Sequence, residues 1–166
     1  ALYSAAQGGH DAVVKALIEA GADVNKSPDS GFSAGETLLY EAACSGREAE
    51  VKALIEAGAN VGTADKNGQT ALYSAAEKGR EAVVKALIEA GADVNKADNN
   101  GRTPLYRAAY SGHEAVVRAL IEAGANVSTS ADDGATPHSV AITPVINVDQ
   151  GGHAAIVLIL RDAGAV

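Results

Sequence analysis

The sequence predicts an all-α fold, a solenoid of helix-turn-helix units stacked in one array. Three observations support this prediction. Residues 1–26 align with residues 71–96 with four differences in 26 positions. The phrase Ala-Leu-Ile-Glu-Ala-Gly-Ala begins at positions 16, 53, 86 and 119, and Tyr40, Tyr73 and Tyr106 are 33 residues apart. Such a period is typical of one supersecondary unit whose apolar faces are buried only when neighbouring units stack.

The glycines divide each unit into a turn and two short helices. In the unit spanning 65–97, Gly68 ends an Asp-Lys-Asn-Gly turn. Gly79 ends a first helix expected over 71–78, and Gly91 closes a second helix, expected over 81–90, as a left-handed cap. The counterparts of Gly79 in the other units are Gly9, Gly46, Gly112 and Gly152. Neither helix is long enough to be stable alone, so each unit must pack against its neighbours.

Side chains at the helix starts support the same division. Thr70 offers its hydroxyl as the N-cap of the first helix, and Pro104 takes the favoured first helical position in the next unit. The second helix has apolar residues at 83, 84, 87 and 88, which form a stripe along one face. Ala75 and Ala76 supply small side chains in the first helix, which lets adjacent layers approach closely.

Taken together, these residues resemble the ankyrin repeat family. The family pattern is a D-x-x-G turn, T-P-L-H-x-A-A, G-H, an apolar helix and G-A-D-V-N. Residues 100–109 read Asn-Gly-Arg-Thr-Pro-Leu-Tyr-Arg-Ala-Ala, residues 112–113 read Gly-His, and residues 91–95 read Gly-Ala-Asp-Val-Asn. The resemblance covers essentially the whole chain and implies an ankyrin solenoid with hairpin tips. One departure is Tyr at positions 3, 40, 73 and 106, where the family usually has His, so the family's Thr–His hydrogen bond cannot be carried over unchanged.

The expected organisation is a single array of five units, spanning 1–27, 28–64, 65–97, 98–130 and 131–166. The first unit is truncated. The second holds four extra residues within 27–35, and the fifth holds seven extra residues near 143–149. Two registers are open for the fifth unit. The one we prefer starts its first helix at Thr136-Pro137, and the other starts it at Thr143-Pro144, which would place Asp149 at a small buried position.

The fifth unit is expected to be the C-terminal cap of the array. Arg161 stands where the other units have an apolar Ile, a polar substitution expected where no further unit stacks. Leu158 takes the position of Lys15, Lys52, Lys85 and Arg118, so it is expected to be exposed. We also expect the chain to be a piece of a longer protein or a component of a complex, because a front half-repeat is missing before Ala1.

Composition excludes several functional classes. The formal net charge of −8 argues against nucleic-acid binding, which depends on clustered Lys and Arg. The longest apolar run, over 154–160, has seven residues, whereas a membrane span needs roughly 20. The single Cys44 can form no internal disulfide, which fits a reducing compartment and leads us to expect an intracellular, cytoplasmic location.

The sequence predicts no catalytic site, no metal site and no cofactor. Cys44 and His153 belong to units three layers apart, which is roughly 25–30 Å at helix packing distances. His10 is in the unit next to Cys44, but it holds the helix-to-helix turn position that Arg47 and Arg80 fill. The His-Glu pair at 113–114 lacks the second His of a zinc signature, and no glycine-rich phosphate-binding motif is present.

The resemblance implies a non-catalytic protein-protein interaction module. In the family, partners are usually bound by turn tips and by the exposed side of the first helices, a concave surface. Carried onto this sequence, the partner-binding residues are Phe32, Lys66, Asn67, Gln69, Glu77, Lys78, Asn99, Asn100, Arg102, Arg107, Tyr110 and Ser111. The units differ most at these positions. Arg102, Arg107 and Tyr110 are of the types enriched at interface hot spots, so we expect the centre of the surface there.

The sequence also leaves alternatives open. In ankyrin proteins the Asn of a D-V-N turn, eight residues after a Leu, can be hydroxylated, and Asn25 and Asn95 match that pattern. An unmodified turn Asn is the alternative at both positions. For the chain as a whole, the alternatives to a partner-binding module are a structural subunit or fixed domain of a larger assembly, and an engineered ankyrin-type binder.

Overall fold

The computed structural model describes residues 11–26, 37–142 and 150–165. In this part of the chain the regular structure is helical, and the one β-type pairing is an isolated antiparallel bridge between Ala64 and Thr70. Phe32, Pro144 and the two inserted segments, 27–35 and 143–149, lie outside the described residues, as does the first helix expected in the first unit. The all-α solenoid predicted from the repeats is confirmed.

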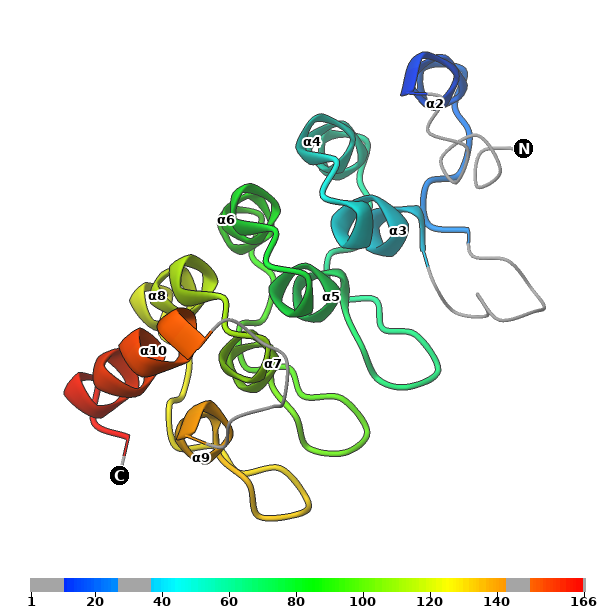
Figure 1. The fold of residues 1–166 in the computed structure, drawn as a ribbon. Coiled ribbons are helices and arrows are strands. Elements are labelled where there is room, and N and C mark those ends of the chain that lie inside the picture. The colour runs from blue at the N-terminus through cyan, green and yellow to red at the C-terminus, as the bar shows by residue number, and fades with distance from the viewer. Residues whose placement is uncertain (1–10, 27–36, 143–149, 166) are drawn as a thin grey trace.

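The helices form two rows (Figure 1). The inner row contains α3 (Leu38–Ser45), α5 (Ala71–Glu77), α7 (Pro104–Tyr110) and α9 (Pro137–Ile142). The outer row contains α2 (Asp11–Glu19), α4 (Glu48–Glu56), α6 (Glu81–Glu89), α8 (Glu114–Glu122) and α10 (Gln150–Asp162). Each inner helix packs against the next inner helix and against the outer helix that follows it in the chain.

Threonine hydroxyls begin the inner helices. The Oγ1 atoms of Thr37, Thr70 and Thr103 each accept a hydrogen bond of 3.2 Å from the backbone N–H three residues later. The predicted N-cap at Thr70 is confirmed. In the fifth unit, Thr136 Oγ1 accepts from the Ser139 N–H at 3.1 Å, and α9 begins at Pro137. The first helix of this unit therefore starts in the register that we preferred.

Burial follows the predicted apolar stripe. Val83, Val84 and Leu87 on α6 are almost wholly buried, and Ile88 is partly buried against the same core. Ala75 and Ala76 on α5 have no exposed surface, because the neighbouring inner helices pack directly over them. Burying one such Val or Leu side chain contributes about 1.5–3 kcal/mol, so the stacking of layers holds these short helices together.

Two glycines that the repeat makes equivalent differ in the structure. Gly79 has φ +68°, and a Cβ atom there would lie 2.6 Å from Nδ1 of His113 in the next unit. Gly152 was expected to make the same turn, but it lies inside α10, which begins at Gln150. Because α10 begins two residues before it, Gly152 is part of a helix and does not take the left-handed conformation of Gly79. The expectation for Gly152 was therefore wrong.

The last outer helix leaves both substituted side chains in solvent. Arg161 is exposed, and Leu158 is 50 % exposed, as the sequence predicted.

The turns also join neighbouring units. The Asn99 N–H donates to the Asn67 carbonyl at 2.9 Å, and the Asp132 N–H donates to the Asn100 carbonyl at 3.0 Å. The tips of the third, fourth and fifth units are therefore hydrogen-bonded side by side.

Candidate interaction surface

The described residues that were predicted to bind a partner lie on one side of the array. We call it the inner face and define it as residues 37–45, 65–78, 98–111 and 131–142, which contain α3, α5, α7 and α9 and the turns before the last three. The turns project from the inner row on the side away from the outer helices (Figure 1). Because α3, α5, α7 and α9 stack on one another, side chains from separate units meet on this face.

Arg107, on α7, is the best-positioned cation of the inner face. Its guanidinium makes an ion pair with Glu77 at the end of α5. Its Cζ atom lies 5.9 Å from the centre of the Tyr73 ring and 5.5 Å from the centre of the Tyr110 ring, within the range of cation–π attraction. Tyr110 is 38 % exposed, so one wall of this cluster faces solvent.

Arg102, which lies just before α7, makes a similar arrangement in which the ion-pair contact is longer. Its Cζ atom lies 5.8 Å from the centre of the Tyr106 ring. Its nearest carboxylate is that of Asp133, with Nη2 and Oδ2 3.8 Å apart and more than half of the aspartate side chain in solvent. A contact of this length between exposed groups contributes little.

Both arginines have an unused donor. The Nε atoms of Arg102 and Arg107 are buried and have no hydrogen-bond partner. A buried N–H without an acceptor costs free energy, about 1–3 kcal/mol for the group. Orphaned donors of this kind are rare in folded proteins.

Beneath the arginines, Tyr73 and Asp98 form a buried polar pair. The Tyr73 hydroxyl donates to Asp98 Oδ2 at 2.8 Å, and Asp98 Oδ1 accepts from the N–H groups of Asn100 and Arg102, each at 2.9 Å. Burial and this hydrogen bond raise the pKa of Tyr73 well above its ordinary value. Burial alone would raise the pKa of Asp98, but the hydrogen bonds that it accepts outweigh burial and lower the pKa.

Tyr106 is the counterpart of Tyr73 in the next unit, but it lacks such an acceptor because Ala131 takes the position of Asp98. No hydrogen bond to the Tyr106 hydroxyl is formed by the residues that the structure describes. Burial, together with the nearby Asp133 carboxylate, raises the pKa of Tyr106, so the hydroxyl keeps its proton at neutral pH. It can therefore act as a donor.

The remaining predicted residues divide into two groups. Lys66, Asn67, Asn100 and Lys78 are exposed and Ser111 is half-buried, so all five are open to a partner in some part. Gln69 and Asn99 instead serve the scaffold. The Gln69 side chain accepts from the Tyr40 hydroxyl at 3.2 Å, and the Asn99 side chain donates to the Lys66 carbonyl at 3.0 Å.

The two candidate hydroxylation sites join consecutive units. The Asn25 amide donates to the Gly58 carbonyl at 3.1 Å, and its Oδ1 accepts from the Asn60 N–H at 2.8 Å. Asn95 repeats the pattern two junctions later, with Gly124 and Asn126 as partners at 3.5 and 2.8 Å. Both side chains have a structural function, and their modification stays a prediction.

Comparison with known families agrees with this geometry. The family profile described as "Ankyrin repeats (3 copies)" matches residues 2–98, 51–131 and 95–165. The chain belongs to the ankyrin repeat family. Ankyrin repeats are generally protein-protein interaction modules, and the family is generally non-catalytic. A search of curated proteins found no match. Among the described residues, no helix has the length and apolarity that crossing a membrane requires.

The outer helices of the ankyrin array present a different surface. On each of three of them a glutamate pairs with a cation four residues later: Glu48 with Lys52 at 2.7 Å, Glu81 with Lys85 at 2.6 Å, and Glu114 with Arg118 at 2.9 Å. This is the favoured orientation of a helical pair. The hydrogen bonds that Lys52 and Lys85 donate to Glu48 and Glu81 raise the pKa values of the two lysines.

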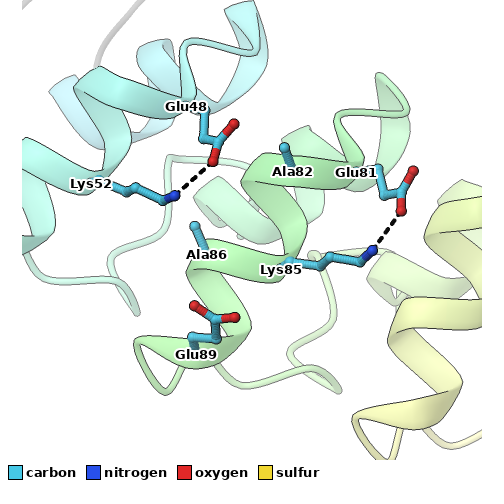
Figure 2. Close-up of a pocket in the computed structure, with 7 residues that line it drawn as sticks. All are labelled: Glu48, Lys52, Glu81, Ala82, Lys85, Ala86 and Glu89. Carbon is cyan, nitrogen blue, oxygen red and sulfur yellow. Dashed lines mark hydrogen bonds and ion pairs between the residues drawn. The ribbon is translucent and has the colours of Figure 1, made fainter.

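An open groove of about 400 Å³ separates α4 from α6 on this outer surface (Figure 2). The two ion pairs line it, with Ala82, Ala86 and Glu89. The Glu48–Lys52 and Glu81–Lys85 pairs each form within one helix, and their side chains remain about half-exposed. It is a solvated face of the ankyrin stack.

Sequence reasoning missed four residues of the inner face: Tyr73, Asp98, Tyr106 and Asp133. Tyr73 and Tyr106 were noted only as a departure from the ankyrin pattern. The spacing of 25 residues gave only a partial signal. It relates Tyr73 to Asp98 and Tyr106 to Ala131, but it also relates Tyr40 to Asp65, and Tyr40 donates to Gln69 instead. The break at Ala131 marks the junction at which the hydroxyl lacks an acceptor.

Proposed function

We propose that this ankyrin array is a non-catalytic module that binds a protein partner through its inner face, centred on Arg102, Arg107 and Tyr110. The observation that carries the proposal is the pair of arginines that lie over tyrosine rings while their Nε donors have no partner. The exposed tip residues Lys66, Asn67 and Asn100 extend the surface on either side.

The arrangement lowers the conformational entropy that is lost on binding. A free surface arginine loses rotamer freedom when a partner immobilises it, at a cost of about 0.5–1.5 kcal/mol. Here Arg107 is already held by Glu77 and two tyrosine rings. Much of the ordering cost is therefore met before the partner arrives. Tyrosine and arginine are also the types that dominate measured interface energies.

The test is a binding comparison between matched variants of the full chain. The triple variant R102A/R107A/Y110A removes the centre of the proposed surface. R118A is the control, because it removes one arginine from the same unit on the outer face, where Arg118 pairs only with Glu114. Each variant is first checked by circular dichroism and thermal unfolding.

The three immobilised proteins are then used to recover partners from a lysate, and recovered proteins are quantified by mass spectrometry. We expect a set of proteins to bind wild type and R118A and to be lost from the triple variant by roughly tenfold or more. Equal recovery on all three proteins would remove the inner face as the binding surface. The expected intracellular location is not tested by this experiment and stays a prediction.

A further inference from the structure

The last layer of the array exposes apolar side chains on both of its helices. In Figure 1 no described helix lies beyond α9 in the inner row or beyond α10 in the outer row. Four large apolar or aromatic side chains of the described residues are exposed, and two of them, Ile142 (57 %) and Leu158 (50 %), belong to these helices. We define the end face as Ile142 with the four exposed residues of α10, which lie along one edge of that helix: Ala154, Leu158, Arg161 and Asp162.

On α10 the charged pair of the other outer helices is replaced by two apolar residues. Ala154 and Leu158 occupy the positions of Glu114 and Arg118, the pair that recurs as Glu48–Lys52 and Glu81–Lys85. Both members of the pair are lost together, so the edge of α10 is apolar where the rest of the outer surface is charged. Apolar side chains that are half in solvent gain free energy when another surface removes them from water.

A further ankyrin unit stacked on the end face would not account for these residues. At internal junctions the Lys52 and Lys85 side chains are 55 % and 56 % exposed, although the next outer helix packs beside them. Leu158, in the same position, would therefore stay largely in solvent. Arg161 replaces an Ile that is partly buried at each internal junction, so a stacked unit would also have to desolvate its guanidinium. The end face suits an occupant other than another repeat.

The charges of the end face are self-complementary. α10 carries one arginine and one aspartate, and α9 carries no Lys, Arg, Asp or Glu, whereas α6 and α8 each carry two glutamates and one cation. The other acidic residues among the described part of this unit are Asp132 and Asp133, in the turn before α9, where Asp133 contacts Arg102. Two copies of a chain with formal charge −8 repel each other in general, so the neutral helix pair is the surface at which they can approach.

We propose that the end face binds a second copy of this chain, in a two-fold dimer that buries Ile142 and Leu158 of both copies. A two-fold contact uses the same patch on both copies, so Arg161 of each can lie against Asp162 of the other, and the assembly closes at two. The centre of the inner face takes no part. The dimer therefore goes beyond the proposed function and does not depend on it.

The experiment measures self-association of the whole chain by sedimentation velocity, with light scattering after gel filtration as the second measurement. Protein concentrations run from about 1 to about 500 µM, a range that covers weak and moderate dimers. The main variant is A154E/L158K, which gives α10 the glutamate–lysine pair of α4 and α6. Because this variant restores the residues of the other outer helices, the monomer should stay folded, and thermal unfolding checks that it does.

Two controls keep the end face intact. V13K removes an apolar side chain that is 49 % exposed on α2, at the opposite end of the array (Figure 1). It tests whether any exposed apolar residue is sufficient, and whether α10 of one copy contacts α2 of another in an open chain. The triple variant R102A/R107A/Y110A removes the centre of the inner face.

Wild type is expected to form a dimer as its concentration rises. A154E/L158K should raise the dimer Kd by about tenfold or more, and both controls should leave it unchanged. R161D gives each copy two anions and no cation on the end face, so it should weaken the dimer by roughly threefold to tenfold. R161D/D162R again has one charge of each sign and should recover most of that loss.

Three outcomes would overturn the proposal. A wild-type monomer throughout the range would leave the end face to a different occupant. A dimer that A154E/L158K does not weaken would place the contact elsewhere. Assembly that grows beyond dimers and is abolished by V13K would show a head-to-tail contact instead of a two-fold one. All three would leave the proposed function standing, because it is tested through the inner face.

Discussion

Two successive junctions between units have the same backbone arrangement but different polar side chains. Between the third and fourth units, the Tyr73 hydroxyl donates to Asp98 at 2.8 Å in a buried pair. Between the fourth and fifth units, Tyr106 is in the equivalent position, but Ala131 offers no side-chain acceptor. Both tyrosines follow a threonine N-cap, and both turns are hydrogen-bonded to the preceding tip.

The difference shows how a repeat can separate stability from binding. In the first junction the polar side chains satisfy one another and hold the stack together. In the second, the loss of one carboxylate leaves the Tyr106 hydroxyl without an acceptor among the described residues. A single substitution in an otherwise repeated scaffold thus removes a structural pair and leaves the Tyr106 hydroxyl able to donate.

The largest effect is expected from removing the acceptor of the first junction. D98A copies the alanine of the second junction and leaves the buried Tyr73 hydroxyl and the N–H groups of Asn100 and Arg102 without their partner. We expect the free energy of unfolding in urea to fall by about 2–4 kcal/mol. D65A is the matched control, because Asp65 holds its own turn but binds no tyrosine. Equal losses in the two variants would contradict the importance of the buried pair.

A smaller effect is expected from removing each hydroxyl alone. Y73F deletes the hydrogen bond to Asp98 and should lower the free energy of unfolding by about 1–2 kcal/mol. Y106F deletes a hydroxyl that has no partner among the described residues, so its change should stay within about 0.5 kcal/mol. Urea unfolding of both variants measures the difference. If Y106F lowers the free energy of unfolding as much as Y73F does, the Tyr73–Asp98 hydrogen bond does not make the two junctions differ in stability.

A pH effect is expected at His113, whose side chain crosses the junction between the third and fourth units. Its Nε2 lies 2.9 Å from the Glu77 carbonyl, which can only accept, so the neutral ring donates from Nε2. Burial first, and then the charges of Arg80 and His153, lower the pKa of His113 below 6.5. The unfolded chain therefore binds the proton more tightly, so this contribution to stability is complete above pH 6.5 and is lost as pH falls through the folded-state pKa.

The measurement for His113 is urea unfolding at several pH values between about 5 and 8. The variant H113R is the comparison, because Arg80 holds the equivalent position and donates from Nε to the Cys44 carbonyl at 3.3 Å. We expect wild type to lose more stability than H113R on acidification. Parallel pH profiles for the two proteins would rule out a contribution from this group.

The smallest effect is expected on the outer face. E81Q removes the charge that pairs with Lys85 beside the groove shown in Figure 2. Both side chains are about half-exposed, so we expect no measurable change in the unfolding midpoint or in partner binding. A clear loss of binding in E81Q would show that the outer helices also contact the partner.

Much of the fold could be predicted because its signals are local. The helices expected over 71–78 and 81–90 are found at Ala71–Glu77 and Glu81–Glu89, since the Thr N-cap and the glycine ends act within one or two turns. The start of α9 could likewise be predicted from Thr136 and Pro137. Gly152 was misjudged because the effect of a long insertion on the next helix is not encoded in the glycine itself.

Less of the candidate surface could be predicted. Arg102, Arg107 and Tyr110 were identified by residue type, and the structure brings each of them against an aromatic ring or a cation. Gln69 and Asn99 were equally variable in the sequence, yet their side chains bind the scaffold. Variation at a tip position shows that the repeat tolerates change there. It does not show whether the side chain faces solvent or binds the scaffold.

The sequence by itself determined the unit: its period of 33 residues, its caps, its turns and the face that each helix buries. These follow from backbone conformation and apolar spacing, which act over a few residues. Only the tertiary structure decided which polar side chains meet. Tyr73 reaches Asp98 and Arg107 reaches Glu77 across a junction between units, because the stacking of whole layers sets the offset between side chains that are far apart in the chain.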